Sequence, residues 1–270
     1  MRPSVVLFLL LVTNAHFVSA QSSTFQLTNP ESVKLLDEVT LLYKKTVIAV
    51  DADLAENVSA LAEVWIDGTP VIKVPAGRNP SEADLVHELF HLKLIADGFG
   101  FIRFNKALPP ALDARLHQWV KDPIQHTVFF PRMKEMGLNP AEQIERIASN
   151  NQSGFVVQSA QPRDLTLVPL FALQMALRDN TPLFDRFVEG KADKDDIAVS
   201  REAVNIVIKD KPRTPDEEVA TVVKVLNCLI PSVGTFSFGR WEQQRKGAVV
   251  VKTAIVEVGA PATQRSCPGN

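Results

Sequence analysis

Residues 79–98 read NPSEADLVHELFHLKLIADG, which is the pattern of one helix with signals for both of its ends. Asn79 can cap the helix, Pro80 suits its first turn, and Glu82 stands where a capping box needs an acidic residue. Leucines recur at helical spacing and predict a stripe that faces the core. Gly98 is a natural stop, because glycine readily takes the left-handed conformation that ends many helices.

This helix, expected to run to about Ala96, contains His87-Glu88-Leu89-Phe90-His91, an H-E-x-x-H motif. Residues four apart share one helix face, so the imidazoles of His87 and His91 point at one spot. Neutral imidazole nitrogens are favoured ligands of tetrahedral zinc. Glu88 lies beside them, where its carboxylate can take a proton from an attacking water and later deliver it to the leaving amine. The plainer alternative is two partly exposed histidines beside an ordinary surface Glu88.

Through this motif, and the hairpin expected before it, the chain resembles the zincin metallopeptidases. The resemblance implies a zinc-dependent hydrolase, with one Zn²⁺ per chain and an extended substrate bound along a sheet edge beside the motif helix. It also implies that His87 and His91 are zinc ligands and that Glu88 is the catalytic base. The resemblance does not extend to residues 140–270.

His126 is the predicted third protein ligand. The four histidines that follow residue 20 all lie in one short stretch, as the ligands of a metal site would. The motif helix ends at Gly98, so the third ligand must come from a later element. His126 follows Asp122-Pro123, which places it in the first turn of a new helix that can face the motif helix. Asp122 is well placed to orient the His126 ring or to bind alongside it.

Several other residues remain open for the third ligand: Asp97, Asp122, His117, Glu135 and Glu142. A metzincin pattern needs glycine at position 94 and histidine at position 97, where this chain has Leu94 and Asp97. A gluzincin pattern would instead take a glutamate from a later helix. A peptidase also needs a donor for the developing oxyanion, and the candidates are His117, Tyr43 and Arg132.

The order of the remaining elements favours an α+β fold, with strands first and helices after them. Asp67-Gly68 separates two β-rich runs, which predicts a hairpin. Pro131 is expected to kink or break the helix that contains His126. We predict a zincin-like fold, in which a small, mostly antiparallel sheet with the motif helix precedes a mostly helical C-terminal part. The expected strands are 46–50, 62–66, 70–74 and 249–258, with an extended connection at 101–104. The expected helices after the motif are 111–120, 122–137, 140–150, 165–179, 182–189, 195–208 and one that opens with a capping box at Thr214.

The first twenty residues have the pattern of a secretory signal peptide. Arg2 gives a positive start, residues 5–12 are apolar, and Val18-Ser19-Ala20 supplies the small residues of a cleavage site. We therefore expect a secreted or periplasmic protein. Residues 21–140 would form the catalytic core, and residues 141–270 would close the cleft within the same globular unit.

Composition narrows the range of partners. The chain has 270 residues, 29 Lys and Arg against 31 Asp and Glu, and a net charge of -2, so no basic excess exists to bind nucleic acid. No later segment reaches the roughly 18 consecutive apolar residues of a membrane helix. In an oxidising compartment Cys228 and Cys267, the two cysteines, are expected to pair. Asn57 and Asn151 fit glycosylation sequons.

These observations lead to one leading function and one alternative. The leading function is an exported zinc peptidase that acts on a peptide or protein substrate, with Glu88 as general base. The alternative is an exported, non-catalytic zincin-fold domain that binds metal or a partner. The oligomeric state stays open.

Overall fold

The computed structural model describes residues 26–54, 58–107, 116, 120–140, 194–229, 236–247, 249–259 and 267. Within these residues, five helices and two three-stranded sheets make an α+β fold, which confirms the predicted class. Several predictions lie outside the described residues: the signal peptide, His117, Glu142, both sequons, the helices at 140–150, 165–179 and 182–189, and most of the helix at 111–120.

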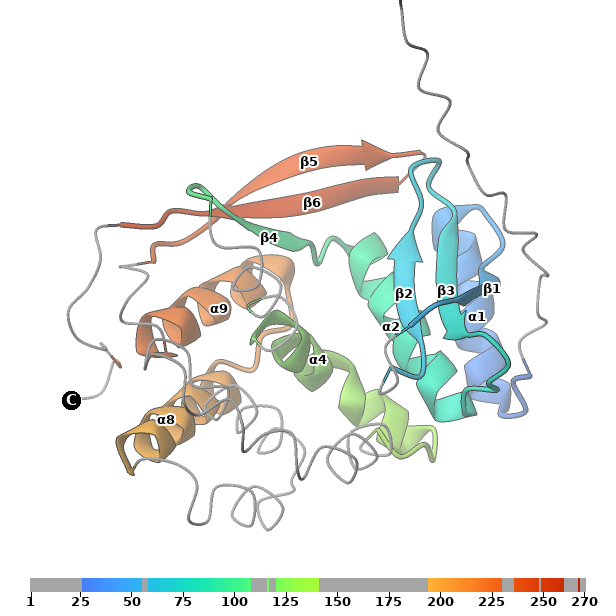
Figure 1. Ribbon diagram of the computed structural model, residues 1–270, viewed down its shortest axis with the longest axis horizontal. Helices are drawn as coiled ribbons and strands as arrows, with labels where there is room; N and C mark the ends of the chain where they lie inside the picture. Colours follow the sequence, from blue (N-terminus) through green and yellow to red (C-terminus); the bar gives the residue numbers. More distant parts are fainter. Residues whose placement is uncertain are drawn as a thin grey trace, which may run out of the picture.

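The described elements mix helices and strands along the chain, with three consecutive strands early and three consecutive helices later (Figure 1). In order they are α1 (Pro30–Tyr43), β1 (Ile48–Ala52), β2 (Leu61–Val64), β3 (Pro70–Pro75), α2 (Glu82–Asp97), β4 (Phe101–Phe104), α4 (Asp122–Glu135), α8 (Lys194–Asp210), α9 (Pro215–Leu229), β5 (Arg240–Lys246) and β6 (Val249–Val256). Both α1 and α2 lie on one side of the first sheet, whereas α9 lies beneath the second sheet with α8 packed against it. The motif helix α2 and α9 flank α4, which therefore connects the two halves.

The first sheet has the order β1-β3-β2. Its β2–β3 hairpin is antiparallel, as the Asp67-Gly68 turn predicted, whereas β1 pairs with β3 in parallel. Asp67 closes the turn, because its carboxylate accepts a hydrogen bond from the Thr69 backbone N–H at 3.0 Å. Gly68 has a φ of 85°, which favours glycine. With one parallel and one antiparallel pair the sheet is mixed, so its expected mostly antiparallel character is not confirmed.

The second sheet has the order β4-β6-β5 and combines strands from both halves of the chain. β6 is the predicted terminal strand, and it pairs with β5 in antiparallel and with β4 in parallel. Residues 101–104, expected as an extended connection, form β4 in this sheet. The sequence analysis did not predict β5, because its residues, RWEQQRK, are largely polar and carry no apolar alternation.

The motif helix α2 starts two residues later than predicted. Ser81 is its cap, and Ser81 and Asp84 exchange the two hydrogen bonds of a capping box. The predicted capping box of Asn79 and Glu82 is therefore wrong. The Glu82 carboxylate instead accepts hydrogen bonds from Thr28 and from the Asn29 backbone N–H, at the start of α1. Gly98 ends the helix in a left-handed conformation with a φ of 97°, as expected.

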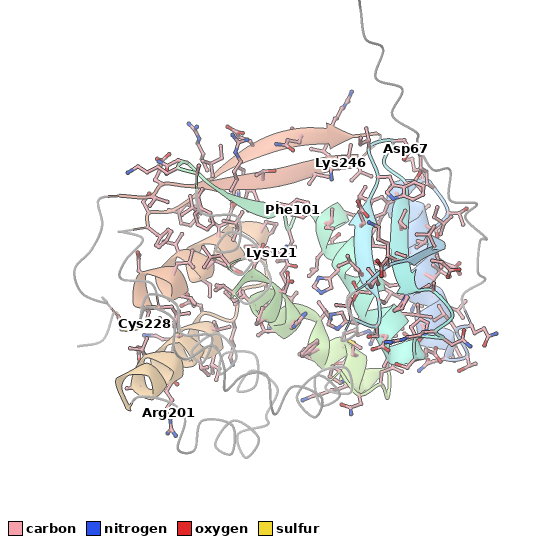
Figure 2. The ribbon with its side chains drawn as sticks, in the orientation of Figure 1. Asp67, Phe101, Lys121, Arg201, Cys228 and Lys246 are labelled. Atoms are coloured by element: carbon pink, nitrogen blue, oxygen red, sulfur yellow. A yellow bond between two sulfur atoms is a disulfide. The ribbon has the colours of Figure 1, made fainter. Side chains whose placement is uncertain are left out.

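Pro131 was expected to kink or break the helix that contains His126. The helix continues past Pro131 to Glu135, so no break occurs there, and Pro131 is exposed. The helix also joins the two hydrophobic cores of the described chain. Ile124 packs among α8, α9 and the second sheet, whereas Phe129 and Phe130 pack among α1, α2 and the first sheet. The side chains in Figure 2 fill the space on both sides of α4.

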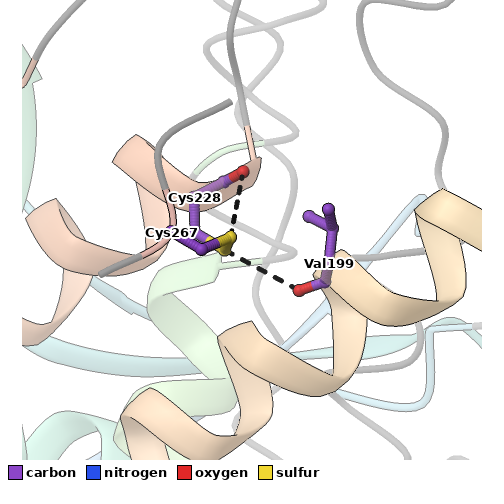
Figure 3. Close-up of a disulfide and its surroundings, with 3 residues drawn as sticks. All are labelled: Val199, Cys228 and Cys267. Carbon is purple, nitrogen blue, oxygen red and sulfur yellow. Dashed lines mark hydrogen bonds between the residues drawn. A yellow bond between two sulfur atoms is a disulfide. The ribbon is translucent and has the colours of Figure 1, made fainter. Parts of the chain in front are cut away.

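Cys228 and Cys267 form a disulfide, which confirms the predicted pair. Cys228 lies on α9, and its Sγ is 3.8 Å from the carbonyl oxygen of Val199 on α8 (Figure 3). The bond joins residues 39 positions apart and thereby attaches Cys267 to the α8–α9 pair.

Candidate metal centre

Three imidazoles converge between α2 and α4. The Nε2 atom of His91 lies 3.1 Å from Nε2 of His87 and 3.3 Å from Nε2 of His126. His87 and His91 share one face of α2, as the spacing predicted, and α4 brings His126 to the same point. The three side chains offer ligand atoms that all lie within 4.8 Å of one another, so they could hold a metal ion.

The spacing of these nitrogens suits a tetrahedral ion. Two ligand nitrogens at 2.0–2.1 Å from a tetrahedral zinc are about 3.3 Å apart. The distances from Nε2 of His91 to Nε2 of His87 and of His126, 3.1 Å and 3.3 Å, are close to this value. Three neutral nitrogen donors are also the ligand set of many catalytic zinc sites, in which a fourth position takes water or substrate.

Aromatic rings hold the imidazoles in place. His126 stacks on Phe130 with ring centroids 4.6 Å apart, and Phe129 meets His87 edge-on at 5.3 Å. Phe129 in turn stacks on Phe90 of α2 at 5.1 Å. His87 and His126 are 6% and 7% exposed, so little of either ring is open to water. Rings packed in this way cannot rotate freely, which preserves the shared geometry of the three nitrogens.

Desolvation also keeps His91 neutral, although its side chain is only partly buried. Desolvation lowers the pKa of His91 to about 4, and the charge of Lys121 lowers the pKa further, whereas Asp122 and a hydrogen bond with Gln125 oppose this. At neutral pH the ring therefore carries a free lone pair on one of its nitrogens. Metal binding requires that unprotonated form.

Glu88 lies next to this cluster and faces the first sheet. Its Oε2 atom accepts a hydrogen bond from the Ala62 backbone N–H on β2 at 2.7 Å, and the side chain is buried. Desolvation raises the pKa of Glu88 to about 8, with smaller contributions from Asp122 and Asp84, although the Ala62 hydrogen bond opposes them. A carboxylate whose pKa lies near neutrality can accept a proton and release it again, as a general base must.

The other candidates for a third ligand that the structure describes are occupied elsewhere. Asp97 forms an ion pair with Lys93 at 2.8 Å at the far end of α2, and Glu135 forms one with Arg132 at 3.0 Å. Asp122 lies near the cluster but pairs with Lys121 at 3.4 Å. The group of three that could hold a metal contains none of these carboxylates.

Two of the proposed oxyanion donors are also described. The Tyr43 hydroxyl is buried and donates a hydrogen bond to the Leu92 carbonyl at 2.8 Å, so that donor is already used. Arg132 is half-exposed and forms ion pairs with Glu31 and Glu135, the surface role that the sequence analysis treated as its alternative.

Three residues near the site were not predicted from the sequence. Lys121 is 9% exposed, and its Nζ atom lies 5.1 Å from the centroid of the Phe101 ring on β4 (Figure 2). Gln125 and Glu218 are fully buried and hydrogen-bonded to each other. The position of Gln125 beside His126 was the only signal for it in the sequence. Glu218 gave none, because it lies 93 positions after Gln125 in the chain.

Comparisons with protein-family models, curated proteins and solved structures give no match for this chain. Among the described residues, no helix is both long and apolar enough to cross a membrane.

Proposed function

We propose that this protein is an exported zinc-dependent peptidase, with His87, His91 and His126 as metal ligands and Glu88 as general base. The observation that carries the proposal is the convergence of three imidazole Nε2 atoms beside a buried carboxylate. The zincin resemblance of the H-E-x-x-H helix supports the choice of zinc and of peptide hydrolysis.

Each residue has a distinct task in this proposal. Zinc, when bound, supplies a Lewis acid that polarises a carbonyl group and makes a water more acidic. Glu88 accepts a proton from the attacking water and passes it to the leaving amine. The Ala62 N–H fixes the Glu88 carboxylate at 2.7 Å, which limits the orientations from which it can act. The phenylalanines around the rings exclude bulk water, which strengthens electrostatic interactions within the site.

The first sheet offers a place for an extended substrate. Among the described strands, β2 is at the edge of its sheet and has only β3 as a partner. An edge strand can pair with an added peptide through backbone hydrogen bonds. Because Ala62 of β2 contacts Glu88, a peptide along this edge would pass beside the base. We therefore propose a peptide or protein substrate that lies along β2.

Export fits the disulfide. The Cys228–Cys267 bond is of the kind that forms and persists in oxidising compartments. Together with the signal-peptide pattern of residues 1–20, it supports a secreted or periplasmic location.

The direct test is Glu88→Gln in the chain from Gln21 onward, with Glu135→Gln as a control for loss of a remote surface carboxylate. Zinc content is measured by elemental analysis, and hydrolysis is measured with unfolded casein and a mixed fluorogenic peptide library. We expect Glu88→Gln to keep one zinc and lose at least about 100-fold in rate, because only the proton transfer is removed. Glu135→Gln should match the wild type.

The outcomes separate the proposal from its alternative. A wild type that binds zinc and hydrolyses neither substrate would favour a metal-binding domain without catalysis. Equal activity in the wild type and Glu88→Gln would remove Glu88 from the mechanism. A wild type that binds no zinc would overturn the metal site itself.

A further inference from the structure

Two lysines from distant parts of the chain gather around one aromatic ring. The Nζ atom of Lys121, just before α4, lies 5.1 Å from the centroid of the Phe101 ring on β4. The Nζ atom of Lys246, at the end of β5, lies 5.6 Å from the same centroid. Phe101 is 38% exposed, and Figure 2 shows it between the two lysines. The fold therefore places two positive charges around one accessible ring.

Phe101 and Lys246 lie on the face of the second sheet that packs against the motif helix. Phe101 pairs with Thr253 of β6, and Lys246 pairs with Val249 of the same strand. Thr253 and Val249 are four residues apart, so their side chains and those of their partners share one face of the sheet. Val249 belongs to the hydrophobic core that includes α2. The ring and Lys246 are thus on the side of the sheet that faces α2.

Lys246 also reaches the edge strand that contacts the proposed general base. Its Nζ atom lies 3.5 Å from the Val64 carbonyl oxygen, and Glu88 accepts a hydrogen bond from the Ala62 N–H at 2.7 Å. Backbone groups two residues apart on a strand point to the same side, so both contacts are made at the free edge of β2. They are about 7 Å apart along the strand. A peptide along β2 that passes Glu88 would therefore meet Lys246 about two residues from the bond that is cleaved.

The charges around Phe101 are only partly neutralised. Lys121 pairs with Asp122 at 3.4 Å, whereas Lys246 forms no ion pair among the described residues. An aromatic ring attracts a cation through its quadrupole but has no net charge, so it holds an ammonium group without neutralising it. Like charges repel each other, and Lys121 is 9% exposed, so bringing both lysines here lowers stability. A bound anion would relieve this repulsion.

We propose that Lys121, Lys246 and Phe101 form a subsite that binds a carboxylate of the peptide substrate. This inference rests on the substrate position along β2 in the proposed function. The carboxylate belongs to an Asp or Glu side chain or to the C-terminus of the peptide, because both present the same charged group. Lys246 contacts it, and the buried Lys121 adds to the positive potential. Because Lys246 already contacts the Val64 carbonyl oxygen, backbone pairing with β2 ends there, and the carboxylate lies at the end of the paired segment.

The test measures peptide binding, so it does not depend on turnover. Three pools of short peptides share the same randomised neutral positions and a neutral fluorophore at the N-terminus. The first pool has a fixed Glu and an amidated C-terminus, the second has a fixed Gln and an amidated C-terminus, and the third has a fixed Gln and a free C-terminal carboxylate. Fluorescence anisotropy gives the dissociation constant of each pool with zinc-loaded Glu88→Gln protein, which we expect to bind peptides without cleaving them.

The variants change one charge at a time in the Glu88→Gln background. Lys246→Met and Lys121→Met keep a long side chain without its charge, and Lys246→Glu reverses the charge. Lys252→Met is the matched control. Lys252 is next to Thr253 on β6, so it lies on the opposite face of the same sheet. Circular dichroism shows whether each variant is folded.

We expect at least one carboxylate pool to bind about 10-fold more tightly than the amidated Gln pool at low salt. The pool that gains identifies the source of the carboxylate, a side chain or the C-terminus. Lys246→Met should reduce the preference to about 2-fold, Lys121→Met should reduce it less, and Lys246→Glu should abolish it. Lys252→Met should keep it. Added salt should also reduce the preference, because dissolved ions screen the attraction.

The results separate this inference from the proposed function. Equal binding of the three pools, no binding of any pool, or a preference that Lys246→Met leaves unchanged would each overturn the subsite. If Lys121→Met fails to fold, the two Lys246 variants decide the question. If the protein binds no zinc, the metal-free protein is measured and the same criteria apply. A wild type that hydrolyses no peptide, although its carboxylate preference depends on Lys246, would overturn only the peptidase. Hydrolysis of all three pools at equal rates, with equal binding, would overturn only the subsite.

Discussion

His91 lies at the centre of the histidine cluster. Its Nε2 atom is close to Nε2 of both other histidines, at 3.1 Å and 3.3 Å. The motif alone predicted that His87 and His91 share a helix face, because that follows from helical geometry. His126 was predicted from its place in the chain and from the scarcity of histidines. That argument needed no knowledge of packing.

At the residue scale, His126→Ala should release zinc to a mild chelator. Loss of one of three ligands weakens a site by orders of magnitude, and the stacked Phe130 offers no replacement nitrogen. His117→Ala is the matched control, and we expect it to keep its zinc. Chelator competition followed by elemental analysis measures both. If His126→Ala keeps one zinc per chain, the third ligand must be another side chain. The result for His117→Ala then shows whether that side chain is His117.

The hydrogen bond between Gln125 and Glu218 could not be predicted from local sequence patterns. Spacing along a helix identifies neighbours on that helix, but Glu218 reaches the site only through the packing of α9 against α4. Nothing near Glu218 in the sequence marks it as a partner of a residue 93 positions away. Its burial and its hydrogen bond to Gln125 both depend on the tertiary structure, so neither could be predicted from the sequence.

At the element scale, the strengths and failures of the sequence prediction have physical causes. The hairpin, the motif helix, α8 and α9 were predicted because turn, cap and periodicity signals are local. The Thr214–Glu217 capping box of α9 is an example, with both of its hydrogen bonds present. β5 was missed because a polar edge strand depends on its partner β6. The cap of α2 was misassigned because Glu82 binds the start of α1 instead.

The turn of the first hairpin should respond to acid. Hydrogen bonds from Thr69, and then from Lys45, lower the pKa of Asp67 to about 2, against an ordinary value of 3.8. A carboxyl group whose pKa is lower in the folded state than in the unfolded chain stabilises the folded state at pH values above the unfolded pKa. That contribution is lost as the pH falls toward 2. Asp67→Ala should therefore be less stable than the wild type at pH 7, and the difference should shrink between pH 4 and pH 2. Urea unfolding at a series of pH values measures it, and a constant difference would contradict the assignment.

At the scale of the whole molecule, the turns of the two hairpins touch. A Cβ atom added to Gly247, in the β5–β6 turn, would lie 1.8 Å from the Asp67 carbonyl oxygen in the β2–β3 turn. Figure 2 shows Asp67 near Lys246, at the end of β5. The Lys246 Nζ also donates to the Val64 carbonyl of β2 at 3.5 Å. This contact joins the two sheets directly.

Gly247→Ala should therefore destabilise the protein more than Gly77→Ala. Both glycines have positive φ, 59° and 72°, so both variants incur the left-handed strain of about 1 kcal/mol. Only Gly247 has backbone within contact distance, since nothing lies within 4 Å of the added atom at Gly77. We expect an additional loss of about 1–3 kcal/mol in the free energy of unfolding for Gly247→Ala. Equal losses in the two variants, measured by urea unfolding, would argue against close contact of the turns.

The disulfide should stabilise the C-terminal half. It closes a loop between residues 39 positions apart, which includes the β5–β6 hairpin. Loop-closure entropy for that length corresponds to about 4 kcal/mol. Cys228→Ala with Cys267→Ala should lower the free energy of unfolding by an amount of that order, as measured by urea unfolding. Two freely alkylated thiols in the exported protein, detected by mass spectrometry, would contradict the bond.

The order of the second sheet has a consequence for how the chain acquires its structure during synthesis. β6 is synthesised after both of its partner strands, yet it lies in the middle of the sheet, between β4 and β5. Phe101 of β4 cannot form its strand pair until Thr253, its partner 152 positions later, has been synthesised. Pairings over such distances make folding slow. The three histidines are synthesised long before β6, so a nascent chain carries the proposed metal ligands well before the sheet that joins its two halves can form.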